Sequence, residues 1–134
     1  NHKVQKKNVR WEQNGNNRTY MNYEIDAQNK KLGRVASQVA VILMGKNKVD
    51  FVRNAIPDVK IKIKNAGKIF VTNKKMEQKV YKNYSGYPGG LKERSMKKVV
   101  SDKGMKEVLR IATRGMLPKN KLRDRMMKNL IIVE

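Results

Sequence analysis

The chain has 134 residues, with 32 Lys and Arg against 11 Asp and Glu, so its formal net charge is +21. This length predicts one domain, and the 39% apolar fraction suffices for a modest core. Repulsion among the cations opposes a compact state until a polyanion neutralises them, which makes nucleic acid the leading partner. The absence of cysteine excludes disulfides and thiolate metal sites. No apolar run approaches the length of a membrane-spanning helix, so a membrane partner is not expected.

Residues 1–21 are predicted to form a basic, extended N-terminal arm. They are polar and basic and show neither a helical nor an alternating period of apolar residues. Trp11 is the one candidate anchor in this arm, and the start of the chain has no apolar signal-peptide core. The remaining residues, 22–134, are expected to form a single α/β domain.

Three elements are predicted in the first half of this domain. A short strand at 23–27 ends in a turn opened by Asp26. From Leu32 to Leu43 apolar residues recur at three- and four-residue steps, which predicts a helix with one buried stripe, and Gly45 is placed to end it in a left-handed conformation. After a basic loop, residues 59–66 alternate Val and Ile with Lys, the pattern of a strand with one dry face and one wet or anion-facing side.

The second half is predicted to hold two strands and three helices. A strand at 68–72 is followed by a long loop, a helix that begins at Ser95, a second helix from Lys106 to Thr113, a basic helix from Lys119 to Asn129 and a closing strand at 130–133. Strands that alternate with helices favour an α/β fold with some parallel pairing. The apolar members of these patterns should form one core: Val35, Val39, Ile42, Ile61, Ile63, Ile69, Leu109 and Leu130.

The stretch YKNYSGYPGGLKER at 81–94 gathers three tyrosines, three glycines and a proline among lysines and arginines. Tyr81, Tyr84 and Tyr87 either pack back on the domain or face a partner. Glycines allow close approach of a partner's backbone, and aromatic planes beside cations are what splayed nucleotides stack on. We interpret the stretch as a loop shaped to contact RNA.

The segment RGMLPKNKLRDRMMK at 114–128 holds six cations around the single acid Asp124. A solvated helix mixes charges of both signs at four-residue spacing, and this segment barely does. Contact with phosphate is the better explanation.

A catalytic role is the easiest to reject. His2 is the only histidine, and the acids are scattered singly among lysines, so neither a catalytic triad nor a metal site is predicted. A nucleic-acid-modifying enzyme would depend on carboxylates such as Asp26, Asp50 or Asp58. An architectural DNA-binding protein also stays open on charge alone, although no recognition helix or insertion wedge is evident.

Four motifs in order carry a family resemblance: LGRVAS at 32–37, KNAGKIFVT at 64–72, SGYPGGLKE at 85–93 and GMLPKN at 115–120. Together they resemble the bacterial-type large-subunit ribosomal protein L-thirteen family over about residues 23–133. The resemblance implies a three-layer α/β/α domain around a small, mainly parallel four-stranded sheet. It implies a structural, non-catalytic constituent of the large ribosomal subunit, without cofactor, that binds and stabilises folded ribosomal RNA during assembly and in the mature ribosome.

The implied partners are large-subunit ribosomal RNA, neighbouring ribosomal proteins and, as in some relatives, the protein's own messenger RNA. The implied location is the cytoplasm, with an organellar ribosome as the alternative. One departure from the family is Lys31, which replaces a threonine, so Asn29 is expected to cap the first helix. The expected RNA-binding residues are Arg34, Lys46, Lys48, Arg53, Lys74, Lys75, Lys82, Tyr84, Ser85, Gly86, Tyr87, Pro88, Gly89, Gly90, Lys92, Arg114, Lys119, Asn120, Lys121, Arg123, Arg125 and Lys128.

Overall fold

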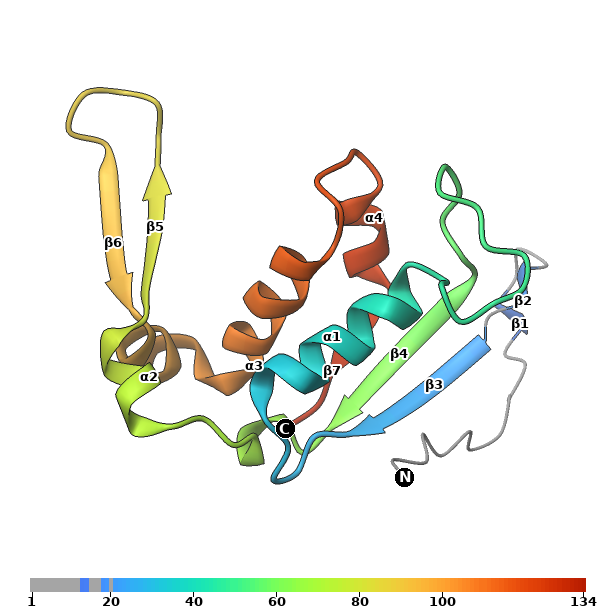
Figure 1. Ribbon diagram of the computed structural model, residues 1–134, viewed down its shortest axis with the longest axis horizontal. Helices are drawn as coiled ribbons and strands as arrows, with labels where there is room; N and C mark the ends of the chain where they lie inside the picture. Colours follow the sequence, from blue (N-terminus) through green and yellow to red (C-terminus); the bar gives the residue numbers. More distant parts are fainter. Residues whose placement is uncertain (1–12, 15–17, 20) are drawn as a thin grey trace.

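The computed structural model describes residues 13–14, 18–19 and 21–134 (Figure 1). Most of the predicted basic arm, including His2 and Trp11, lies outside the described residues. Within that arm, the short strands β1 (Gln13–Asn14) and β2 (Arg18–Thr19) pair antiparallel.

The main sheet consists of β3 (Met21–Asp26), β4 (Val59–Lys64) and β7 (Leu130–Ile132), in the order β3-β4-β7. Both neighbouring pairs are parallel. Parallel strands need crossover connections, and helices supply them here. The predicted α/β class with a mainly parallel sheet is therefore confirmed.

Strand β4 separates the two faces of this sheet as its alternation predicts. Val59, Ile61 and Ile63 are fully buried, whereas Lys62 and Lys64 are exposed. Helix α1 (Leu32–Leu43) packs along β4, and α3 (Met96–Met116) packs on α1 (Figure 1). On the lysine face the described residues remain solvent-accessible, so we do not find there the second helical layer of the expected α/β/α arrangement.

The core contains every residue predicted for it. Val35, Val39, Ile42, Ile61, Ile63, Ile69 and Leu109 are buried, and Leu130 is partly buried against them.

Helix α1 ends as predicted but begins differently. Gly45 has φ +74° and donates to the Ile42 carbonyl, while Lys46 donates to that of Val41, which is the paired hydrogen-bond pattern of a left-handed helix stop. The predicted cap at Asn29 is wrong, because Lys31 holds the N-cap position without a side-chain hydrogen bond. Asn29 itself adopts φ +55° in the turn before the helix.

The segment at 68–72 is not the fourth strand that we expected. Residues Ala66–Lys68 form the 3-10 turn η1, and an isolated parallel bridge joins Phe70 to Lys31. Phe70 donates to the carbonyl of Lys30 and accepts from the amide of Leu32, after which the chain leaves this edge. The main sheet in the described part of the chain therefore has three strands.

The predicted loop from 73 to 94 is also wrong, because it contains regular structure. Helix α2 (Asn73–Gln78) is followed by a hairpin of β5 (Val80–Tyr84) and β6 (Leu91–Ser95), paired antiparallel from Val80↔Ser95 to Tyr84↔Leu91. Only residues 85–90 form the loop. The many glycines made the whole stretch look irregular, although all of them lie at the tip.

The last helices follow the predicted order with shifted bounds. Ser95 caps α3 by accepting from the amide of Lys98 at 3.3 Å. The helix predicted to begin at Ser95 and the helix predicted from Lys106 to Thr113 join in α3 across a kink at Gly104, where φ is +76°. Helix α4 spans Arg123–Lys128, shorter than predicted, because residues 118–122 form turns after Pro118.

Candidate nucleic-acid interface

Three loops project from the same side of the domain (Figure 1). They are residues 44–58 between α1 and β4, the hairpin tip at 85–90, and residues 117–122 between α3 and α4. The first and third follow the carboxyl ends of α1 and α3, which carry partial negative charge. Lys46, Lys48, Lys119 and Lys121 follow these ends and offset that charge, so the edge presents net positive charge.

The loop at 44–58 combines cations with exposed apolar side chains. Lys46 and Arg53 are exposed and Lys48 is partly exposed. Val49 is fully exposed, and Phe51 and Val52 are also accessible to solvent. Large apolar side chains on a free surface of this kind indicate a contact with a partner.

The hairpin tip holds its aromatic residues in solvent. Tyr84 is 61% exposed and Tyr87 is 75% exposed, while Tyr81 is half-buried. Of the two alternatives left open by the sequence, Tyr84 and Tyr87 face outward, whereas Tyr81 packs partly against the domain. Ser85, Tyr87 and Pro88 are exposed in the same turn as Gly86 and Gly89.

The glycines of the tip have distinct structural roles. Gly86 and Gly89 adopt φ +92° and +71°, a region that other residues rarely enter. Gly90 has an ordinary φ, but an added Cβ would collide with the side chain of Ser85. The Gly90 amide donates to the Tyr87 carbonyl at 3.0 Å and closes the turn. The tip is thus a tight, defined loop.

The basic segment 114–128 is anchored by apolar residues. Leu117, Met126 and Met127 are buried, whereas Met116 is 42% exposed. The segment presents these exposed polar or charged side chains to solvent: Lys119, Asn120, Lys121, Arg125 and Lys128.

Two arginines of this segment differ from its exposed cations: one forms an ion pair, and the other is partly buried. Arg114 forms an ion pair with Asp124 at 3.0 Å. Arg123 is partly buried, and its Nε has no hydrogen-bond partner in the described part of the chain. A guanidinium in this position is ready to bind an anion through its outer nitrogens.

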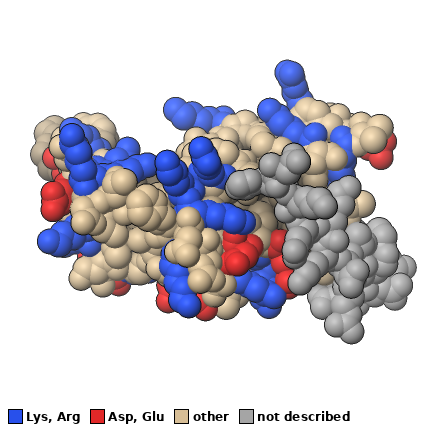
Figure 2. All heavy atoms as spheres, turned by 60° about the horizontal axis from the view of Figure 1, so that its bottom comes forward, with Lys and Arg blue, Asp and Glu red and all other residues tan. Residues whose placement is uncertain are grey.

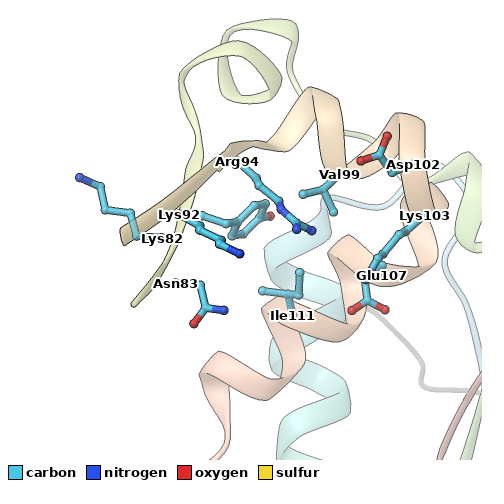
Figure 3. Close-up of a pocket in the computed structure, with 10 residues that line it drawn as sticks. Lys82, Asn83, Lys92, Arg94, Val99, Asp102, Lys103, Glu107 and Ile111 are labelled. Carbon is cyan, nitrogen blue, oxygen red and sulfur yellow. The ribbon is translucent and has the colours of Figure 1, made fainter. Parts of the chain in front are cut away.

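The two hairpin lysines lie on opposite faces of the ribbon. Lys82 pairs with Glu93 across the strands, and its Nζ lies 2.7 Å from a carboxylate oxygen. The hydrogen bond and the charge of Glu93 raise the pKa of Lys82. Lys92 pairs with Asn83 and points to the other face, toward α3 (Figure 3). Of these two lysines, only Lys92 therefore offers a charge that no acidic side chain neutralises.

Three predicted residues lie away from the projecting loops. Arg34 is exposed near the first turn of α1, about 16 Å along the helix from Gly45 at 1.5 Å per residue. Lys74 and Lys75 are exposed on α2, at the base of the hairpin (Figure 1). They extend the basic surface and do not belong to the same edge.

Cations cover much of the surface. Figure 2 shows Lys and Arg side chains across one face, with several projecting along one rim and acidic side chains in small groups. The described residues contain no group of three or more His, Cys, Asp or Glu placed to hold a metal ion. Among the described helices, none combines the length and hydropathy that crossing a membrane requires.

Sequence reasoning missed a hollow between the hairpin and α3. It is lined in part by Tyr81, Arg94 and Glu107, which our expected RNA-binding residues do not include. The alternation of Tyr81 with Asn83, and of Lys92 with Arg94, is the signal that would have placed them on one face. It becomes readable only when 80–95 is recognised as a hairpin.

Known proteins similar to this chain identify its family. The sequence model of the family described as ribosomal protein L13 matches residues 20–134. The large ribosomal subunit protein uL13 of Caldanaerobacter subterraneus is 47% identical over 81% of this chain and 75% of its own length. The uL13 proteins of Rubrobacter xylanophilus and Thermus thermophilus are 44% and 45% identical over 82% and 79% of this chain, and 76% and 75% of theirs. The chain therefore belongs to the ribosomal protein L13 family.

Proposed function

We propose that this protein is a structural, non-catalytic constituent of the large ribosomal subunit that binds and stabilises folded large-subunit ribosomal RNA. Support comes from membership of the ribosomal protein L13 family and from relatives named as large ribosomal subunit proteins. The net charge of +21 supplies the attraction to a polyanion. The cytoplasm of a bacterial-type cell is the location that fits these relatives.

The observation that carries the proposal most directly is the side shared by the three projecting loops (Figure 1). In this mechanism Lys46, Arg53, Lys119 and Lys121 neutralise phosphates, which gives affinity without reading sequence. The exposed ring of Tyr87 stacks on an unpaired base or ribose. The apolar core holds the loops at fixed distances, so the protein recognises the shape of folded RNA.

Neighbouring ribosomal proteins and the protein's own messenger RNA are the finer proposed partners. The exposed apolar residues Val49, Phe51 and Val52 suit a protein neighbour, because phosphate gains nothing from apolar contact. Messenger RNA would use the same cations as ribosomal RNA, so the two should compete.

The test is sedimentation of a cell extract with and without ribonuclease. The protein should migrate with large subunits and leave that fraction when the RNA is digested. Migration with chromosomal DNA would favour an architectural DNA-binding protein instead. Free protein at the top of both gradients would contradict the proposal.

A further inference from the structure

A hollow of about 180 Å³ lies between the β5–β6 hairpin and α3 (Figure 3). This volume is below the roughly 300 to 1,000 Å³ of pockets for drug-sized ligands, so it suits a single small ring system. Its lining comes from both elements: Tyr81, Lys82, Asn83, Lys92, Arg94, Val99, Asp102, Lys103, Glu107 and Ile111.

One part of the hollow is apolar. Tyr81 is half-buried, Val99 is buried and Ile111 is partly buried. The Tyr81 phenol is uncharged at neutral pH, and burial raises its pKa further. A flat apolar surface of this kind accepts the face of another ring.

The hairpin register brings polar groups to the same place. Tyr81 pairs with Arg94 and Asn83 pairs with Lys92, so these four side chains share one face of the ribbon. In Figure 3, Lys92 and Arg94 reach from the hairpin toward α3, whereas Lys82 points away. The Lys82 charge is in any case neutralised by Glu93.

Helix α3 adds carboxylates opposite these cations. Asp102 and Glu107 line the hollow, although the whole chain has only eleven acids. Neither side-chain carboxylate forms an ion pair or hydrogen bond within residues 21–134. A site for phosphate alone would exclude carboxylates, because like charges repel. The hollow instead matches a ligand with three features. Its N–H donors would meet the carboxylates, its flat ring would meet the apolar ring of Tyr81, and its phosphate would meet the cations.

We propose that this hollow binds one unpaired guanine nucleotide of an RNA. Guanine presents two adjacent donors, N1–H and the N2 amino group, which match the two acceptor oxygens of one carboxylate, and Glu107 supplies them. Tyr81 supplies the stacking surface, and Lys92 and Arg94 hold the phosphate. The inference deepens the proposed function, because it assumes that the partner is RNA.

The test is a titration of the isotope-labelled full chain with guanosine monophosphate, with uridine monophosphate and with inorganic phosphate. Binding is followed by the shifts of the backbone amide signals in NMR spectra. Guanosine monophosphate should shift the signals of Tyr81, Arg94 and Glu107 saturably. It should bind at least about fivefold more tightly than uridine monophosphate, the lower end of what a paired donor–acceptor contact to a base discriminates. Equal binding of inorganic phosphate with the same shifts would overturn the proposal in favour of a general anion site.

The matched variants are Glu107→Gln in the hollow and Glu77→Gln on α2, which change the net charge equally. Glu107→Gln should remove the preference for guanine, because it should weaken the binding of guanosine monophosphate at least about fivefold. Glu77→Gln should leave this preference intact. Tighter binding by Glu107→Gln would mean that only charge matters and would overturn the proposal. The ranking of nucleotides on the unsubstituted protein decides the question even if a variant does not fold.

Affinity for a large-subunit RNA fragment, measured on the same samples, separates the two levels of inference. Strong RNA binding without a preference for guanosine monophosphate would overturn the guanine site and leave the proposed function standing. An absence of RNA binding would contradict the proposed function itself.

Discussion

The protein contains two β structures that are built in opposite ways. In the β3-β4-β7 sheet, β4 buries Val59, Ile61 and Ile63 completely. In the β5–β6 hairpin, only Tyr81 and Ser95 among the ten strand residues are even partly buried. The sheet is held by apolar burial, whereas the hairpin is held mainly by its backbone ladder and by packing at its base.

This difference indicates which region stabilises the fold and which meets a partner. A two-stranded hairpin is marginal in water by itself, so its shape depends on the turn and on contacts with α2 and α3. Exposed Val80, Tyr84, Tyr87 and Leu91 gain nothing for the free protein. We infer that their burial comes from binding.

Removing a core side chain should have the largest effect. Ile61→Ala should lower the free energy of unfolding by about 2 to 5 kcal/mol, because it opens a cavity at a fully buried site. Leu91→Ala in the hairpin is the control and should cost no more than about 0.5 kcal/mol. Denaturant unfolding measures both, and equal losses would erase the distinction between the two β structures.

Substitutions at the hairpin tip should come next. Gly90→Ala forces a collision with Ser85, and overpacking of this kind costs about 1 to 3 kcal/mol locally. Gly115→Ala on α3 meets no atom within 4 Å and should be neutral or stabilising by up to about 1 kcal/mol. The hairpin amides in NMR spectra should shift in the first variant while those of β4 stay unchanged. Unfolding of the whole domain by Gly90→Ala would show that the hairpin belongs to the core.

The Tyr87→Ala substitution tests whether the hairpin tip serves binding and not stability. The ring is 75% exposed, so thermal unfolding should barely change. Affinity for a large-subunit RNA fragment should fall by about 1 to 3 kcal/mol, because a stacked base loses its platform. A drop in stability that matches the drop in affinity would make the loop a scaffold.

The salt dependence of RNA binding tests the basic loop between α3 and α4. Replacing Lys119 and Lys121 by glutamine should flatten the plot of log affinity against log salt by roughly 0.7 to 0.9 per lost phosphate contact. Lys62 and Lys68, exposed elsewhere, form the control pair with the same change in charge. If both pairs flatten the plot equally, the loop has no special role.

The smallest effect concerns acid stability of the sheet end. A hydrogen bond from Asn65, another from the Gln28 amide, and the charges of Lys30 and Lys64 hold the pKa of Asp26 below its ordinary value. This stabilisation is complete above about pH 3.9, where the unfolded aspartate titrates, and is lost as the pH falls through the lowered value. Asp26→Asn should therefore unfold with a weaker pH dependence in that range. Unfolding midpoints between pH 5 and 2 test it, with Asp58→Asn as control.

Patterns that reflect burial were readable from the sequence, and patterns that depend on pairing were not. The stripe from Leu32 to Leu43 and the alternation of β4 record which side chains avoid water, so helix, strand and core were predicted correctly. The hairpin was missed because its strands bury almost nothing and leave no periodic signal. The strand predicted at 68–72 did not form, because the 3-10 turn at Ala66–Lys68 includes its first residue and only Phe70 makes a bridge to Lys31.

The sequence predicted which residues form the candidate interface, but it did not predict how they are arranged in space. The lysines and arginines of the three loops are evident in the sequence. The common side of the loops after α1 and α3 follows from these helices ending at the same edge, and the position of the hairpin tip follows from the β5–β6 pairing. The hollow at Tyr81, Arg94 and Glu107 depends on the register between β5 and β6 and on the path of α3, which no local pattern encodes.

Hydrogen exchange of the full chain, free and bound to a large-subunit RNA fragment, tests the division between sheet and hairpin most directly. Amides of β4 should exchange slowly in both states, because they open only with global unfolding. Amides of β5, β6 and residues 85–90 should exchange quickly in the free protein and slow markedly on binding. Hairpin amides that are already as protected as those of β4, or that do not respond to RNA, would contradict this account.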